Sequence, residues 1–563
     1  MKSHKPASSA LLKWENAGKK LATALSAYLQ SCASLETLST TQSVDYSDMP
    51  NRIQISLETL HPKLFDELSQ SQVILARMNN KMSSRFNSLP NEILAEIFLD
   101  VVYNPGPDEA RFPEMVDSIR RILGRLHCLL AVCSTWRNVA MDLGDLWTVI
   151  PVTDSRSSFP ALEALSLGLQ RARPSGERHL HLAAVLRDNG YDPSTLFNGI
   201  ILSRLTTVNI EARSKRATSS VCSLLRRLLG SRPAPISEMS IHQYRDPEEK
   251  PPLRSLTDDQ YFDFHMSQGE DMVFRDLMES LTVLRLKNVN LRWETITFSS
   301  RLVDLRLQSM VLGEHFILDD LPGVLQSAPE LRNLEFISLI ALPPTWDHPF
   351  PTAVTLPKLQ TLLLADLFLN IFYYLRGSIA HGAYQTKVGL TRRNWTSLDS
   401  GLDTDGWDEE EPLNVDIRSV LRSSRIDTLI LNQDNRELQW TNKETLSLIL
   451  GSAPTLRSLA IIGSNWDMES IRAIERPTSD ESFPHLDELY ILDSYIEDAD
   501  HLADVAASHL LRVLAVDGPN SLISTNVNHE DIIQRLGHVV PDLRFVGGSE
   551  QLDELNYQSW RLW

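Results

Sequence analysis

Apolar residues recur in one short pattern through the C-terminal part of the chain. The wording is L-x-x-L-x-L, in which isoleucine, valine or phenylalanine replaces some leucines. Its period of two predicts short strands that bury one face. The copies span residues 281–286, 302–307, 331–336, 359–364, 426–431, 456–461, 486–491 and 511–516; fainter copies span 205–210 and 236–241, and a degenerate one begins at Leu543. Most starts lie about 21 to 32 residues apart, which indicates an internal repeat.

The segments between these strands carry the rest of each repeat. Residues 318–325 and 445–450 have helical patterns, and proline precedes several strands, as at Pro329 and Pro454. Proline cannot continue a helix, so it sets the turn before the strand. One repeat cannot bury its leucines alone, whereas stacked repeats share a continuous core. An ordinary α/β domain with leucine-rich strands is the alternative, and the recurrence disfavours it.

The repeats resemble irregular leucine-rich repeats, because the usual asparagine after each strand is not kept. The resemblance implies an α/β solenoid over 151–563, with parallel strands on the concave face and helices on the convex face. Loop insertions are expected near 242–270 and 376–415. The second contains an acidic run at 403–411, which is either a solvated surface loop or an acidic lip for a basic target.

Residues 86–150 have a helical pattern in two apolar blocks. In the first, Pro90 can occupy the first helical position, and Ile93 and Ile97 lie on one face with their neighbours Leu94 and Phe98. The second block continues this spacing with Leu129, Val132, Cys133, Trp136 and Val139. A module of two or three short helices has a marginal core, so part of its apolar surface needs a partner.

The order Leu-Pro at 89–90, Val-Cys at 132–133, Trp-Arg at 136–137 and Leu-Trp at 146–147 resembles an F-box. The resemblance implies a three-helix module that docks on the Skp-family adaptor of a cullin–RING ubiquitin ligase. The positions that match the docking helices are Leu89, Pro90, Ile93, Ile97, Phe98, Leu129, Val132, Cys133 and Trp136. The connection is longer than usual, so an inserted loop is expected near 103–123.

Other interpretations of this module are an ordinary helical hairpin and an N-terminal cap for the repeat array, which such arrays need. Leu89 and Pro90 discriminate between them. A cap would bury this pair against the first repeat, whereas a docking module would leave it accessible.

Two helical segments precede the module. Residues 1–50 contain lysines and the apolar spacing of an amphipathic helix, which predicts a docking helix or a flexible extension. Residues 51–85 repeat leucine and isoleucine at helical spacing, and Pro62 is expected to kink that helix or restart it.

Charge and cysteine content narrow the functional classes. The net charge of −19 disfavours a general binder of nucleic acid or anionic membranes. Four scattered cysteines predict neither a disulfide framework nor a zinc site, and Cys128 and Cys133 are expected to be buried. No apolar run is long enough for a membrane span. These features favour a reducing compartment, cytoplasmic and/or nuclear.

No catalytic motif is present, and no cofactor is expected. His179 and His181 alternate in a strand-like run, which fits half-buried histidines better than a metal site. A hydrolase on an α/β fold is the weakest interpretation. The sequence therefore predicts a non-catalytic, substrate-recognition subunit of a ubiquitin ligase, whose repeats bind an unidentified target protein. The alternative is a ligase-independent repeat scaffold for protein–protein interaction, capped by the helical module.

Overall fold

The computed structural model divides into two units, residues 1–88 and 89–563. Each unit is described by itself. The residues that it describes are 5–41, 48–83, 86, 89–104, 114–153, 168–172, 179–187, 202–214, 217–229, 235–244, 274–293, 296–314, 320–342, 352–396, 417–433, 440–477, 483–497, 499–518, 521–522, 529–547, 552, 555 and 557.

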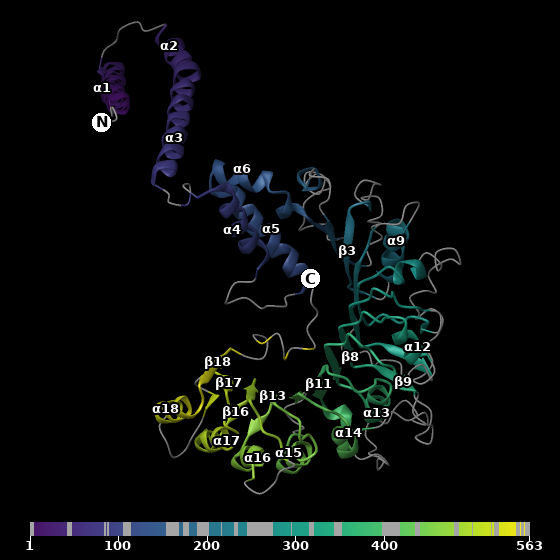
Figure 1. The fold of residues 1–563 in the computed structure, drawn as a ribbon. Helices are drawn as coiled ribbons and strands as arrows, with labels where there is room; N and C mark the ends of the chain where they lie inside the picture. Colours follow the sequence, from purple (N-terminus) through teal and green to yellow (C-terminus); the bar gives the residue numbers. More distant parts are fainter. Residues whose placement is uncertain are drawn as a thin grey trace. The chain divides into compact units, whose positions relative to one another are not determined.

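The first unit consists of helices, as the apolar spacing predicted (Figure 1). Its elements are α1 (Lys5–Thr41), α2 (Met49–Ile55), the π-helical η1 (Ser56–Leu60) and α3 (His61–Ser83). The last three form one continuous helix. The irregularity expected at Pro62 is a π turn that ends directly before His61. Proline has no N–H to donate to the preceding turn, and the wider π turn accommodates the loss of that hydrogen bond. Tyr28 on α1 contacts this turn, with its hydroxyl 3.0 Å from Ser56 Oγ.

The second unit begins with a helical module. It contains α4 (Asn91–Tyr103), α5 (Met115–Val132), α6 (Ser134–Asp142) and the 3-10 turn η3 (Gly144–Trp147). Leu94 and Phe98 of α4 pack with Leu126 and Leu129 of α5 in a small core of its own. Trp147 closes the module by donating from Nε1 to the carbonyl of Ala140 at 2.9 Å.

A parallel sheet follows the module, and fourteen strands of it lie within the described residues. They are β1 (Val149–Thr153), β2 (Leu180–Leu186), β3 (Leu205–Ala212), β4 (Glu238–Gln243), β5 (Val283–Lys287), β6 (Asp304–Gln308), β8 (Asn333–Ile337), β10 (Thr361–Ala365), β11 (Gln385–Leu390), β12 (Thr428–Asn432), β13 (Ser458–Ile462), β15 (Glu488–Leu492), β17 (Val513–Asp517) and β18 (Asp542–Val546). Each pairs with the next in chain order. This one-way progression is the topology of a repeat array.

Helices and short turns connect the strands. They include α9 (Ala217–Leu229), α12 (Leu321–Gln326), α13 (Leu369–Gly377), η8 (Arg392–Trp395), α14 (Ile417–Ser423), α15 (Lys443–Leu450), α16 (Met468–Ile474), η9 (Ala499–His501), α17 (Leu502–His509) and α18 (His529–Val539). Two small parallel pairs join β7 (Val311–Glu314) to β9 (Ile340–Leu342) and β14 (Asn465–Trp466) to β16 (Tyr495–Ile496). Figure 1 shows the connecting helices on one side of the sheet.

Alternation along the strands creates two faces. In β5, Leu284 and Leu286 are buried in the main core with the helices, and Arg285 and Lys287 lie on the other side. We call these the helix-covered face and the opposite face. The first leucine of the motif, such as Leu281, precedes the strand and is also buried. Each buried leucine contributes about 1.5–3 kcal/mol, and the core is shared between neighbouring repeats.

A left-handed backbone residue follows many of the strands. Asn288, Ser309, Ser338, Asp366, Gly463 and Asp493 all have φ between 51° and 81°. Several of their N–H groups donate to the end of the next strand; Ser309 N reaches the carbonyl of Ile337 at 2.8 Å, and Asp366 N that of Gly389 at 2.9 Å. The left-handed conformation therefore recurs at one position of the repeat, which is occupied by glycine, asparagine and aspartate, the residues that adopt positive φ most readily, and by two serines.

Two spans expected as inserted loops contain regular structure. Residues 385–390, inside the expected insertion at 376–415, form β11 between β10 and β12. Much of the expected loop at 103–123 is the first part of α5, because Met115, Ile119 and Ile122 continue the helical spacing of Leu126. The acidic run 403–411 and residues 245–270 lie outside the described residues.

We expect Gly463→Ala to destabilise the protein by about 1–3 kcal/mol, because a side chain there combines positive φ with a steric clash. The φ angle is 81°, and a Cβ would lie 2.9 Å from the Gln433 carbonyl oxygen. Thermal unfolding measures the effect. Gly518→Ala is the control, since a Cβ there meets nothing within 4 Å. Equal melting temperatures for the two variants would contradict the prediction.

Stability should fall as the pH drops below 6.5, partly through His509. This buried side chain accepts from the Leu486 N–H at Nδ1 and lies 2.7 Å from the Ile474 carbonyl at Nε2. Burial lowers its pKa below the ordinary 6.5, so the unfolded chain takes up the proton first. The folded state then loses up to about 1.4 kcal/mol per pH unit. Denaturant titrations at pH 7.5 and 5.5 should show a smaller loss for His509→Gln, whose amide cannot titrate; an equal loss would exclude His509.

Candidate functional site

The nine residues expected to bind an adaptor differ in exposure. Phe98 and Leu129 are buried in the module core. Leu89, Ile97, Cys133 and Trp136 are half-buried, and Pro90, Ile93 and Val132 are exposed. The two buried residues therefore hold the helices together, and the three exposed residues are available for contact with a partner. Leu89 packs on the module core, as do Ile97 and Trp136, rather than on the sheet.

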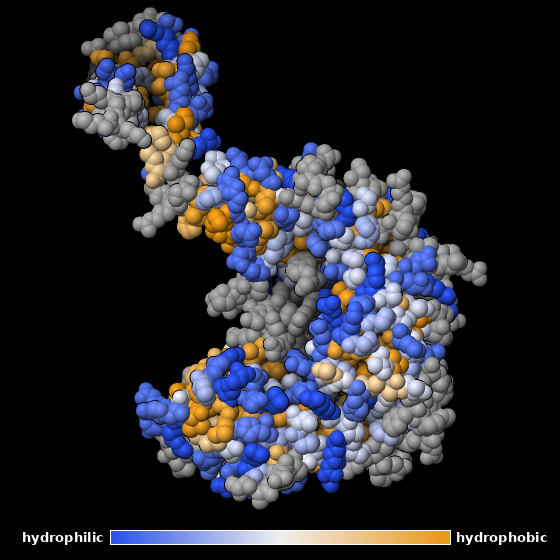
Figure 2. Space-filling model, viewed as in Figure 1, coloured by the Kyte–Doolittle hydropathy of each residue, from blue (hydrophilic) through white to orange (hydrophobic). Residues whose placement is uncertain are grey.

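Apolar residues form a partly exposed stripe along α4. Ile93, Ile97 and Val101 follow one another four residues apart, so they share one face. Ile93 is 48% exposed and Val101 is 43% exposed. Apolar side chains gather visibly over this part of the module (Figure 2). We call Ile93, Ile97 and Val101 the α4 stripe.

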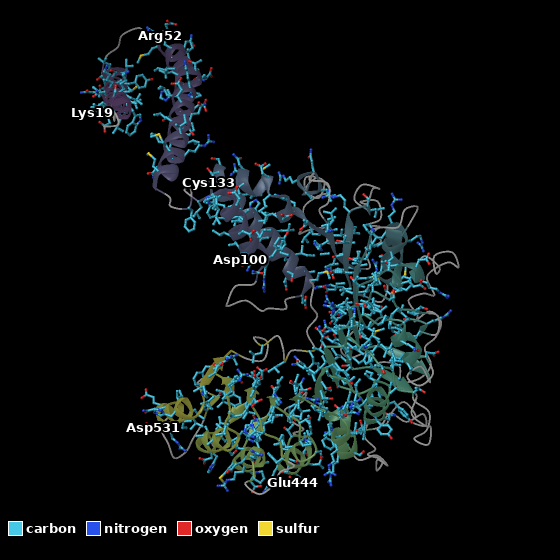
Figure 3. The ribbon with its side chains drawn as sticks, viewed as in Figure 1. Lys19, Arg52, Asp100, Cys133, Glu444 and Asp531 are labelled. Atoms are coloured by element: carbon cyan, nitrogen blue, oxygen red, sulfur yellow. The ribbon has the colours of Figure 1, made fainter. Side chains whose placement is uncertain are left out.

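The junction between α5 and α6 carries another exposed apolar residue of the module. Cys133 is extended, with φ of −160°, and its Sγ accepts from the Trp136 N–H at 3.4 Å (Figure 3). The apolar face expected to run through residues 129–139 is thus divided between two helices. Val132, the last residue of α5, is 56% exposed. Trp136 in turn packs on Phe98, with 5.0 Å between ring centroids.

Two details of this region differ from expectation. Pro90 is the N-cap of α4 rather than its first helical residue, with φ of −58° and ψ of 149°. Cys128 is exposed and Cys133 is half-buried, whereas both were expected to be buried. Cys128 precedes the buried Leu129 on α5 and therefore points away from the core.

The first half of α5 anchors the module to the sheet. Met115, Val116 and Ile119 form a small core with Ala183 and Val185 on the opposite face of β2. Arg213, directly after β3, forms ion pairs with Glu114 at 2.7 Å and with Glu211 at 2.8 Å. The anchoring residues are separate from the α4 stripe, so the module can cover the first strands and still present that stripe.

The opposite face carries one continuous row of paired residues from β2 to β18. In strand order the row is Val185, Glu211, His242, Lys287, Gln308, Ile337, Ala365, Gly389, Ile430, Ala460, Tyr490, Ala515 and Arg544. Its first part is polar and charged, and the part from β8 to β17 is apolar. We call the residues from Ile337 to Ala515 the apolar row.

Burial and like charges shift the pKa values in the polar part. Burial lowers the pKa of His242 to about 3, helped by the positive charge of Lys287. Burial also lowers the pKa of Lys287 to about 8, with Arg306 acting in the same direction. Burial raises the pKa of Glu211, although the positive charge of Arg213 acts in the opposite direction. Sequence reasoning missed these residues, because only strand register brings them together.

The described residues contain no group of three or more histidine, cysteine or carboxylate side chains that could hold a metal ion. His181 lies on β2, and burial lowers its pKa. All four cysteines are free. In the part of the chain that the structure covers, no helix is both long and apolar enough to cross a membrane.

No family model matches this chain, and no curated protein sequence matches it. Among solved structures, the leucine-rich repeat-containing protein LegL7 from Legionella pneumophila is similar at 10% sequence identity and a TM-score of 0.29. That match covers 69% of this chain and 98% of LegL7.

Ile119→Ala should loosen the module from the sheet. Ile119 is 1% exposed, so its truncation leaves a cavity against β2 and costs about 2–5 kcal/mol. Hydrogen exchange should accelerate in β1 and β2, and the melting temperature should fall. Asp117→Ala, two residues away and exposed, is the control. Unchanged exchange in β1 and β2 would show that this contact does not anchor the module.

Proposed function

We propose that this chain is the substrate-recognition subunit of a Skp–cullin–F-box ubiquitin ligase. The helical module binds the Skp-family adaptor, and the opposite face of the sheet binds the target protein. The chain itself catalyses nothing; it holds lysines of the target near the subunit that transfers ubiquitin. The cytoplasm and the nucleus are the compartments that fit this role.

The α4 stripe, in which Ile93 and Val101 are exposed, is the observation that carries this proposal. Pro90 and Ile93 are exposed at the start of α4, although α5 already packs against the sheet. A module that served only as a cap would have no need of exposed apolar side chains away from its contact with the repeats. Apolar groups on a protein surface mark interaction sites when they lie together. The order of motifs in residues 89–147 supports an F-box as the reason for this surface.

Binding of a purified Skp-family adaptor to the full chain tests the proposal. We expect Ile93→Asp and Val132→Asp each to weaken binding at least about tenfold, because each places a charge in an apolar interface. Both residues are exposed, so the variants should stay folded. Isothermal titration calorimetry measures affinity, and circular dichroism verifies folding.

Met468→Asp is the matched control, since Met468 is an exposed apolar residue on α16, 36% accessible, outside the module. It should bind the adaptor like the unmodified chain. Equal weakening by all three variants would indicate a nonspecific effect, and no binding by the unmodified chain would reject the adaptor role.

A ligase-independent repeat scaffold is the second candidate. The contact of Met115, Val116 and Ile119 with β2 favours it, because this contact gives the module a capping role of its own. The adaptor measurement distinguishes the two: a scaffold would retain target binding and ignore the adaptor.

A further inference from the structure

Leu552, Leu555 and Tyr557 pack on the apolar row. Leu555 and Tyr557 are buried, at 3% and 6% exposed, in a cluster with residues of the opposite face from β8 to β17. Leu552 packs against the same cluster. This cluster is separate from the main core under the helices, which contains neither Leu555 nor Tyr557. These three residues therefore cover a surface that the repeats themselves leave open.

Two small residues of the sheet leave space for the Tyr557 ring. Ala365 and Gly389 are register partners on β10 and β11, and neither has a long side chain. A Cβ on Gly389 would lie 2.9 Å from Tyr557 Cε1 and 2.7 Å from the Ala365 Cβ. Glycine at this position thus allows the aromatic ring to approach the backbone of the strand.

A charged side chain fixes the same residue through its backbone. The buried Arg306 donates from Nη2 to the Tyr557 carbonyl at 2.6 Å. The same guanidinium contacts Gln308 Oε1 at 2.8 Å and Glu335 Oε2 at 3.0 Å, which holds it in place. Recognition of a main-chain carbonyl by a positioned arginine does not depend on the identity of that residue, whereas the ring site favours an aromatic side chain.

We propose that Leu552, Leu555 and Tyr557 belong to a built-in ligand of the opposite face, which competes with target proteins for it. The surface binds a protein segment with the spacing Leu-x-x-Leu-x-Tyr, and the chain's own copy occupies it when no target is present. The proposal rests on target binding by the opposite face as part of the proposed function. It is independent of the adaptor, so failure of either can be recognised separately.

Tethering explains how a modest contact can keep the surface occupied. Few residues separate β18, which ends at Val546, from Leu552. A short linker gives an effective concentration on the order of millimolar. A target at lower concentration must therefore bind more tightly than the tethered segment in order to displace it. Weakening the segment should open the surface.

The test inserts a specific protease site after Gly548 of the full chain, which folds with its segment in place and is then cut. A fluorescent peptide of residues 549–563 is titrated into cut and uncut protein, and its anisotropy is recorded. We expect saturable binding to the cut chain and at least about tenfold weaker binding to the uncut chain. A peptide carrying Leu555→Ala and Tyr557→Ala, and one of scrambled sequence, should bind at least about tenfold more weakly.

A second arm uses no protease. The full chain carrying Leu555→Ala and Tyr557→Ala should bind the unmodified peptide at least about tenfold more tightly than the parent chain. The proposal is overturned if the cut chain loses its native circular dichroism spectrum, because the segment is then an integral part of the fold. It is also overturned if the folded, cut chain binds the unmodified and the doubly substituted peptides equally.

Discussion

Burial of leucines between neighbouring repeats is the constraint on which the second unit depends. Leu284, Leu305 and Leu334 are register partners on successive strands, and each is at most 1% exposed. No single strand and helix could shield such side chains. The ladder of parallel hydrogen bonds fixes the strand spacing. A left-handed residue follows many of the strands at the same position of the repeat. Stability is therefore a property of neighbouring pairs rather than of individual repeats.

The same alternation creates the surface on which function is proposed. Because every second residue of a strand points away from the helices, a sheet of this length also presents a long second face. That face differs along its length. Near β2 it is covered by α5, around β4 to β6 it carries charged and polar groups, and from β8 to β17 it carries the apolar row. The apolar part is where Leu555 and Tyr557 lie.

The helical module keeps its anchoring residues apart from its exposed apolar residues. Met115 and Ile119 in the first half of α5 pack on the sheet, while Val132 at its end is exposed. The length of α5 makes this separation feasible, since about 1.5 Å per residue places its two ends roughly 25 Å apart. The residues that join the module to the repeats, Met115 to Ile119, thus fall within the span where the F-box resemblance predicted an inserted loop.

The sequence by itself determined the elements whose signal is local. Leucine periodicity located most strands, including those at Leu284 and Leu514, and helical spacing located the module. It did not find β1 or β11, whose residues lack the leucine wording, because their strand state depends on pairing with β2, β10 and β12. It missed the turn residues Ser309 and Ser338, since positive φ is imposed by the stacked strands rather than by serine. Only the tertiary structure revealed the contact between Arg306 and Tyr557, which are 251 residues apart in the sequence. A contact between such distant residues produces no periodic pattern in the sequence, so periodicity could not predict it.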